Sequence, residues 1–190
     1  MNDLHRELAP ISDAAWAQIE EEASRTLKRY LAARRVVDVP DPKGLALAAV
    51  GTGHTQPIEA PDEGVQAARR GANALVELRV PFKLTRQAID DVERGATDSD
   101  WSPLKEAARK IAFAEDRAVF DGYAAAGIQG IRSGASNPAL TLPSAAMGYP
   151  GAVAQAVNQL RLAGVNGPYV LVLGADPYTA ASGGSEEGYP

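Results

Sequence analysis

The stretch SPLKEAARKIAFAEDRAVF, residues 102–120, is the strongest helix signal in the chain and decides the fold. Ser102 is the expected helix cap, and Pro103 suits the first helical position, where its missing N–H costs nothing. An i,i+4 pair of Glu106 and Lys110 adds support. One long face carries mostly small apolar side chains, at Leu104, Ala107, Ala108, Ile111, Ala114 and Ala118. Because small side chains let other backbones approach closely, we expect neighbouring segments to pack on this helix.

Upstream, residues 12–35 predict a second amphipathic helix. Ser12 or Asp13 is a plausible cap, and acidic residues precede basic ones, which suits the helix dipole. Apolar side chains recur at spacings of three and four, at Trp16, Ile19, Ala23, Leu27 and Leu31. Two interpretations stay open: the helix packs on its own domain, or its basic, partly apolar end faces a partner.

The segment between these helices is rich in loop signals. Residues 36–39 predict a short strand closed by Pro40, and residues 75–80 alternate like a half-buried strand before Pro81. Glycine and proline punctuate residues 45–85, which hold few large apolar side chains. Such a segment cannot form a core alone, so it must lean on the rest of the chain or on another subunit.

Further elements flank and follow the long helix. A polar helix is expected over residues 85–94. The stretch from Asp90 to Asp100 is acidic and is either a solvated helix end and turn or a cation site. Residues 151–162 predict a third amphipathic helix and residues 169–173 a buried strand. A short helix is expected from Asp176 to the glycines at 183 and 184.

Composition excludes several classes of protein. The 190 residues hold 19 Lys and Arg against 24 Asp and Glu, a net charge of −5 that disfavours nucleic-acid binding. Cysteine is absent, and two histidines cannot build a three-histidine zinc site. No apolar run approaches the roughly 20 residues of a membrane helix, and the first residues do not resemble a signal peptide. We therefore expect a soluble, cytosolic protein of mixed structure.

Catalytic motifs are also missing. The run Gly51-Thr52-Gly53 begins like a dinucleotide fingerprint but has Gln56 at the last glycine position. A serine–histidine–aspartate triad would have to use His5 or His54, and neither is expected on a rigid element. The residues thus favour an interaction or assembly protein over an enzyme.

Several motifs nevertheless match a known family, in the right order along essentially the whole chain. They are NDLHRELAP (2–10), AW (15–16), RRVVDV (34–39), ELRVPF (77–82), IDDVERG (89–95), AEDR (114–117), GPY (167–169) and GYP (188–190). Together they resemble encapsulin shell proteins, and most closely the actinobacterial, linocin-like members.

The resemblance implies an α+β subunit of the tailed-phage major capsid fold, also called the Hong-Kong-97 type. Its parts would be an N-terminal helix and arm (1–43), an extended loop (44–84), a peripheral domain with a spine helix (85–135) and an incomplete axial domain (136–190). Such subunits self-assemble in the cytoplasm into a closed icosahedral nanocompartment, typically of sixty copies. The shell encloses a cargo enzyme, commonly a peroxidase or a ferritin-like protein that stores iron.

The resemblance also implies two functional surfaces and no catalytic residue, cofactor or metal. A C-terminal targeting peptide of the cargo is expected to dock at Leu27, Tyr30, Leu31, Arg34 and Asp38. The five-fold pore is expected to be lined by Ser185, Glu186, Glu187, Gly188 and Tyr189. A ring of carboxylates would favour small cations over anions.

Subunits of this family are longer than this chain. We therefore expect a fragment, a truncated relative, or a split subunit whose second chain supplies the remainder.

One alternative function belongs to a different class of protein. Older naming of linocin-like members as bacteriocins suggests a peptidase or bacteriolytic enzyme, in which His54 would be the residue to test.

Overall fold

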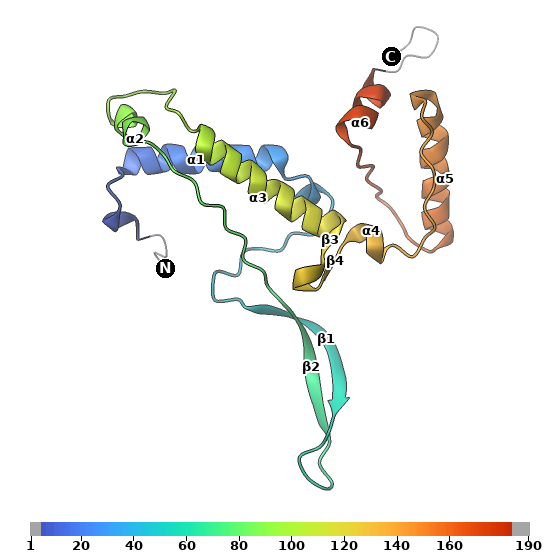
Figure 1. Cartoon of the computed structure of the whole chain (residues 1–190). Coiled ribbons are helices and arrows are strands. Elements are labelled where there is room, and N and C mark those ends of the chain that lie inside the picture. The colour runs from blue at the N-terminus through green and yellow to red at the C-terminus, as the bar shows by residue number, and fades with distance from the viewer. Residues whose placement is uncertain (1–4, 184–190) are drawn as a thin grey trace. The chain divides into compact units, whose positions relative to one another are not determined.

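The computed structural model describes residues 5–183 and falls into two compact units, Met1–Ser133 and Gly134–Pro190 (Figure 1). The first unit holds helices α1 (Asp13–Tyr30), α2 (Arg86–Glu93) and α3 (Ser102–Phe120). Its strands are β1 (Ala49–Ile58), β2 (Ala67–Ala74), β3 (Gly122–Tyr123) and β4 (Ile128–Gln129). Short helical turns are η1 (Arg6–Leu8), η2 (Ala33–Arg35) and η3 (Ala124–Ala126), and a further turn, α4 (Ile131–Gly134), spans the boundary with the second unit. Helix and strand in one unit agree with the expected α+β class.

The second unit is mainly helical. It contains η4 (Ala146–Gly148), α5 (Tyr149–Leu162) and α6 (Ala175–Ser182). Proline stands in the first turn of α5, as the capping preference predicts. The helices expected over residues 151–162 and from Asp176 are therefore present. Within the described residues, no helix combines the length and the apolar character needed to cross a membrane.

A small core forms where α1, α2 and the start of α3 meet. The Ser12 hydroxyl accepts the Ala15 N–H at 3.2 Å and caps α1, while Thr85 caps α2 through the Ala88 N–H at 3.1 Å. The buried cluster comprises Ala15, Ile19, Val92, Trp101 and Leu104. Figure 1 shows α1 and α3 side by side, and the two helices are in contact. The predicted apolar faces of α1 and α3 agree with the buried ones in part: Ile19, Leu104 and Ala107 are buried as expected. The buried face of α1 also includes Glu22 and Thr26, which the apolar pattern did not predict.

The start of α3 differs from the prediction. Ser102 is the first residue of the helix and not its cap; the Asp100 carboxylate accepts the Ser102 N–H at 3.0 Å instead. The reason is Trp101, whose 6% exposed side chain belongs to the core and occupies the position before the helix. Asp100 therefore has a structural role, and residues 5–183 contain no cluster of three or more carboxylate or histidine side chains able to hold a metal.

Strands β1 and β2 form an antiparallel hairpin, and no third strand lies beside it within residues 5–183. Ala49 pairs with Ala74 and Ile58 with Ala67, and the register shifts between Gly51 and Thr55 at a bulge. Every residue of β1 is exposed. The hairpin (residues 49–74) therefore buries almost none of its surface within the chain.

Three predicted strands are not formed, at residues 36–39, 75–80 and 169–173. Their apolar side chains remain largely exposed, as at Leu78, Val170 and Leu171. A strand needs a row of backbone hydrogen bonds to a neighbour. Within the described residues, the Leu75 N–H donates to the Ala48 carbonyl at 2.9 Å, and no strand pairs with the rest of these segments. Their sequences have the alternation or apolar run of a strand without the partner that would complete one.

After α3 the backbone makes a close contact with itself. Gly122 pairs with Gln129 between β3 and β4, and Gly122 has a φ of 93°. A side-chain carbon on Gly130 would lie 2.3 Å from the Gly122 nitrogen and 2.4 Å from the Asp121 carbonyl carbon. One on Gly122 would lie 2.8 Å from the Gly130 nitrogen. Both positions therefore exclude every residue except glycine.

Candidate functional site

The end of α1 is fixed against α3 by a carboxylate. The Asp116 side chain accepts the backbone N–H groups of Ala32, at 3.0 Å, and Ala33, at 2.9 Å. These groups begin the η2 turn, where the backbone has free N–H donors. The direction in which the chain leaves α1 is therefore set by α3.

The adjacent residue, Glu115, holds the Arg34 side chain. Arg34 Nε donates to Glu115 Oε1 at 2.5 Å, and its Nη2 donates to Oε2 at 2.8 Å. This two-bond contact raises the pKa of the Arg34 guanidinium, first through the hydrogen bonds and then through the charge of the carboxylate. Since both side chains are partly exposed, the pair contributes orientation more than stability.

A groove of about 410 Å³ lies beside the Arg34–Glu115 pair and is lined by residues of α1, η2 and α3. We call it the leucine groove. Leu31 is only 9% exposed and forms part of its floor. It is lined by Ser24, Leu27, Lys28, Leu31, Arg34, Arg35, Ile111 and Glu115. An apolar floor with charged sides is suited to a short peptide that carries alternating apolar side chains.

Three of the five residues predicted to bind a peptide line this groove: Leu27, Leu31 and Arg34. Tyr30 lies elsewhere, because adjacent helix positions are about 100° apart and Tyr30 faces another flank than Leu31. Its ring contacts Phe113 edge to face, with the ring centroids 5.7 Å apart. Asp38 is exposed and does not line the groove. The structure thus brings together three of the predicted residues and separates two.

Tyr30 instead lines a second hollow of about 340 Å³ between α1 and α3, which we call the basic hollow. It is lined by Glu22, Arg25, Thr26, Arg29, Tyr30, Lys105, Glu106 and Arg109. The sequence analysis missed this site. The available signal was the i,i+4 spacing of Arg25 with Arg29 on one helix and of Lys105 with Arg109 on the other.

Glu22 is the buried charge at the edge of the basic hollow, with a side chain only 9% exposed. Burial acts to raise the pKa of its carboxyl group. Hydrogen bonds from Arg25 and Thr26 and the nearby charge of Lys105 outweigh burial, and the pKa lies below its ordinary value. Glu22 is therefore an ionised structural group, held by Arg25, by the Thr26 hydroxyl at 3.1 Å and by the Lys105 ammonium at 3.8 Å.

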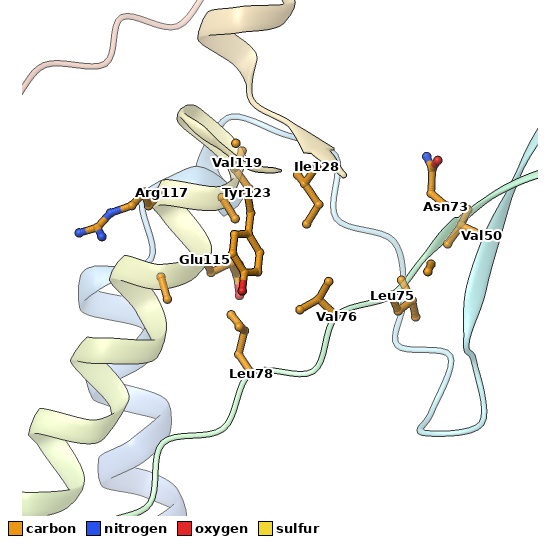
Figure 2. A pocket seen from close by; sticks show the side chains of 14 residues that line it. Val50, Asn73, Leu75, Val76, Leu78, Glu115, Arg117, Val119, Tyr123 and Ile128 are labelled. Atoms are coloured by element: carbon orange, nitrogen blue, oxygen red, sulfur yellow. The ribbon is translucent and has the colours of Figure 1, made fainter. Parts of the chain in front are cut away.

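A cavity of about 740 Å³ lies between the base of the hairpin and the end of α3 (Figure 2). Val76, Leu78 and Ile128 extend toward its centre, whereas Arg117 points away. Val76 and Leu78 belong to the segment that was predicted as a half-buried strand and that forms none. Val76 and Leu78 thus keep the predicted alternation, because both side chains are directed at an apolar cavity.

The remaining predicted residues, those of the pore and His54, do not form a site in the described structure. The expected pore residues, Ser185 to Tyr189, lie outside residues 5–183, which the structure describes. His54 is exposed on β1 and lines a hollow with Arg70 and Gly71. No carboxylate of the described chain pairs with His54. The described residues around His54 thus lack the carboxylate partner of a hydrolytic triad.

The sequence of the chain is similar to those of several known proteins. The family model Linocin_M18, described as an encapsulating protein for peroxidase, matches residues 1–190. A type 1 encapsulin shell protein of Rhodococcus erythropolis is 61% identical over the whole chain, which covers 72% of that relative. Shell proteins of the same name from Mycobacterium tuberculosis and Brevibacterium linens are 58% and 53% identical, with 72% and 71% of their lengths covered.

Proposed function

Because this chain belongs to the encapsulin shell protein family, we propose that its copies close into an icosahedral nanocompartment of sixty subunits around a cargo enzyme. The role of shell protein follows from the family match over all 190 residues. We further propose the Hong-Kong-97-type fold, a cytoplasmic location, and a peroxidase or a ferritin-like protein as cargo. The long helix α3 and the extended hairpin support that fold.

The exposed hairpin is the observation that best supports assembly of the chain into a shell. In the part of the chain that the structure describes, its strands pair only with each other, and apolar side chains such as Val50 and Ile58 are about half exposed. Stable interfaces between subunits bury large areas that are often apolar. Residues 45–80 therefore suit burial against a neighbouring subunit.

The test is negative-stain imaging of the purified chain, combined with light scattering. Closed particles of uniform size support the shell function. A monomer that hydrolyses peptides or cell walls, and loses that activity on His54→Ala, would instead support the alternative enzyme hypothesis. The described surroundings of His54 offer no support for that alternative.

Cargo binding is proposed for the leucine groove. Its apolar floor can receive apolar side chains of a targeting peptide, and Arg34 can donate to a backbone carbonyl or carboxylate. Tyr30 and Asp38 were part of the same prediction, and they serve here as comparison positions outside the groove.

Leu27→Asp is the sharper test of cargo binding than Leu31→Asp, because Leu31 is nearly buried and its substitution endangers folding. We expect shells of Leu27→Asp to form without retaining co-expressed cargo, while shells of Asp38→Asn retain it. Equal cargo retention in both variants would contradict a site in the leucine groove.

The pore proposal concerns residues 185–189, which lie outside the described residues. Five copies of Glu186 and Glu187 around one axis would form a negatively charged ring. We expect Glu186→Gln combined with Glu187→Gln to slow iron uptake by a ferritin-like cargo, and more so at low salt. Uptake equal to that of the parent at both salt levels would reject the pore-charge proposal.

A further inference from the structure

The basic hollow contains two cations without a carboxylate partner among the described residues, Arg29 and Arg109. Their guanidinium carbons lie 5.7 and 5.5 Å from the centroid of the Tyr30 ring, and Arg109 also lies 5.1 Å from the Phe113 ring. Contact with aromatic rings orders a guanidinium group while the N–H groups at its edge remain free to donate. These two arginines are thus prepared to bind carboxylates.

The charge balance of the hollow points the same way. Four cations and two carboxylates line it. One of the carboxylates, Glu22, is already bound by Arg25, Thr26 and Lys105. The local excess of positive charge contrasts with the net charge of −5 of the whole chain. Such a surface favours an acidic partner.

An acidic partner is available on the same chain, at the end of the hairpin. Residues 59–66, which we call the acidic tip, contain Glu59, Asp62 and Glu63 and no lysine, arginine or histidine. All eight residues are exposed. The Asp62 carboxylate accepts the Glu63 N–H at 2.7 Å, while the carboxylates of Glu59 and Glu63 make no hydrogen bond or ion pair within residues 5–183.

We propose that the acidic tip of one copy docks in the basic hollow of a neighbouring copy. This inference rests on the proposed shell function and names the surface that receives the hairpin. Ile58 precedes the tip, Val65 lies within it, and both are exposed. They can therefore contact Tyr30 and Phe113 while the carboxylates bind the arginines. A contact between two different surfaces repeats from copy to copy and can close a ring.

The acidic stretch from Asp90 to Asp100, in the second half of α2 and the turn after it, is a weaker partner for the hollow. Asp90 lies 3.5 Å from Arg86, and Asp91 pairs with Arg94. Asp100 accepts the Ser102 N–H. Three of its carboxylates are therefore already engaged within their own chain, whereas Glu59 and Glu63 are not.

A charge-swap experiment tests the contact. The variant Glu59→Lys with Glu63→Lys, and the variant Arg29→Glu with Arg109→Glu, should each lower the assembled fraction at least about tenfold in about 50 mM NaCl. Combining all four changes restores the parent net charge and opposite charges, and should return assembly to within about twofold of the parent. Asp41→Lys with Asp98→Lys is the matched control, since it changes the net charge as the tip variant does and should assemble normally.

Crosslinking gives a second measurement that does not depend on charge. The chain has no cysteine, so Glu63→Cys and Glu106→Cys can be made in separate chains and mixed. A short bifunctional maleimide should join the two variants into mixed dimers. Circular dichroism of each arginine variant checks that α1 and α3 still form.

The outcomes separate the two proposals. A parent chain without closed particles contradicts the shell function, while mixed crosslinks in the same sample would still support the tip-to-hollow contact. Closed particles that assemble normally in both charge-reversal variants and give no mixed crosslink would overturn the contact. Reversal variants that form normal shells but lose cargo would assign the hollow to cargo and also overturn it.

Discussion

The helical part of the first unit and its hairpin show two ways in which a sequence can specify structure. Helices α1, α2 and α3 bury their apolar residues against one another, as Ile19 and Leu104 do. The hairpin holds ten and eight residues in its two strands and leaves nearly all of them exposed. The helices are therefore stabilised within one chain, whereas the hairpin has the shape of an element completed by another molecule.

The largest expected effect comes from removing the hairpin. Deleting residues 52–72 should abolish closed particles, because it removes the element proposed to bury against a neighbour, and should leave a folded helical monomer. Light scattering measures the first result and far-ultraviolet circular dichroism the second. Intact shells from the deleted chain would contradict the contrast between the two regions, as would loss of the helical signal.

A second prediction compares the same kind of change in the two regions. Leu104→Ala should lower the free energy of unfolding by about 3 kcal/mol, because the side chain is only 4% exposed and its removal leaves a cavity. Ile58→Ala, at a side chain that is 52% exposed, should change it by less than about 0.5 kcal/mol. Urea denaturation of the dissociated chain at low concentration measures both values. Equal losses would show that the hairpin is already buried in the single chain.

A smaller effect is expected where α1 ends on α3. Asp116→Ala removes the acceptor for the Ala32 and Ala33 N–H groups and should cost about 1 kcal/mol of unfolding free energy, as loss of a helix cap does. Asp116→Asn keeps one acceptor oxygen and should cost less. The ranking is checked by thermal unfolding of the two variants beside the parent. The reverse ranking would mean that charge, and not hydrogen bonding, holds this turn.

The smallest effect is the pH dependence of the helical region. The pKa of Glu22 lies below its ordinary value of 4.5, and the hydrogen bonds from Ser102 lower the pKa of Asp100 from 3.8. A carboxyl group with a lowered pKa in the folded state adds stability above its ordinary pKa. That stability is lost as the pH falls through the lower, folded-state value.

We therefore expect the melting temperature to fall as the pH drops below about 4.5. The double variant Glu22→Gln with Asp100→Asn should have a flatter profile than the parent. Differential scanning fluorimetry between neutral and acidic pH compares the two. Identical slopes would rule out these two groups as the source of the acid sensitivity.

The helices were predictable because their information is local. Periodic apolar side chains and caps such as Ser12 and Thr85 lie within the segments that they shape. Asp100 was placed in an acidic run and not at the helix start, because the burial of Trp101 is a tertiary feature that no spacing rule contains. Family likeness, and not residue pattern, supplied the shell function.

The strands were predicted poorly because their information is shared with a partner. The segment around Val76 and Leu78 has the alternation of a strand, yet alternation does not say where the neighbouring strand comes from. At the candidate peptide site, Leu27 and Leu31 line one groove, as their helix spacing predicts. Tyr30 lines a different hollow, because the position of α3 decides which flank of α1 becomes a groove.

The close contact between Gly122 and Gly130 has a consequence for how this protein can vary. In a library that encodes every amino acid at position 130, only glycine is compatible with the backbone of this turn. Glycine at this position therefore identifies the turn from sequence alone. A related sequence with any other residue there must turn the chain after its long helix along a different path.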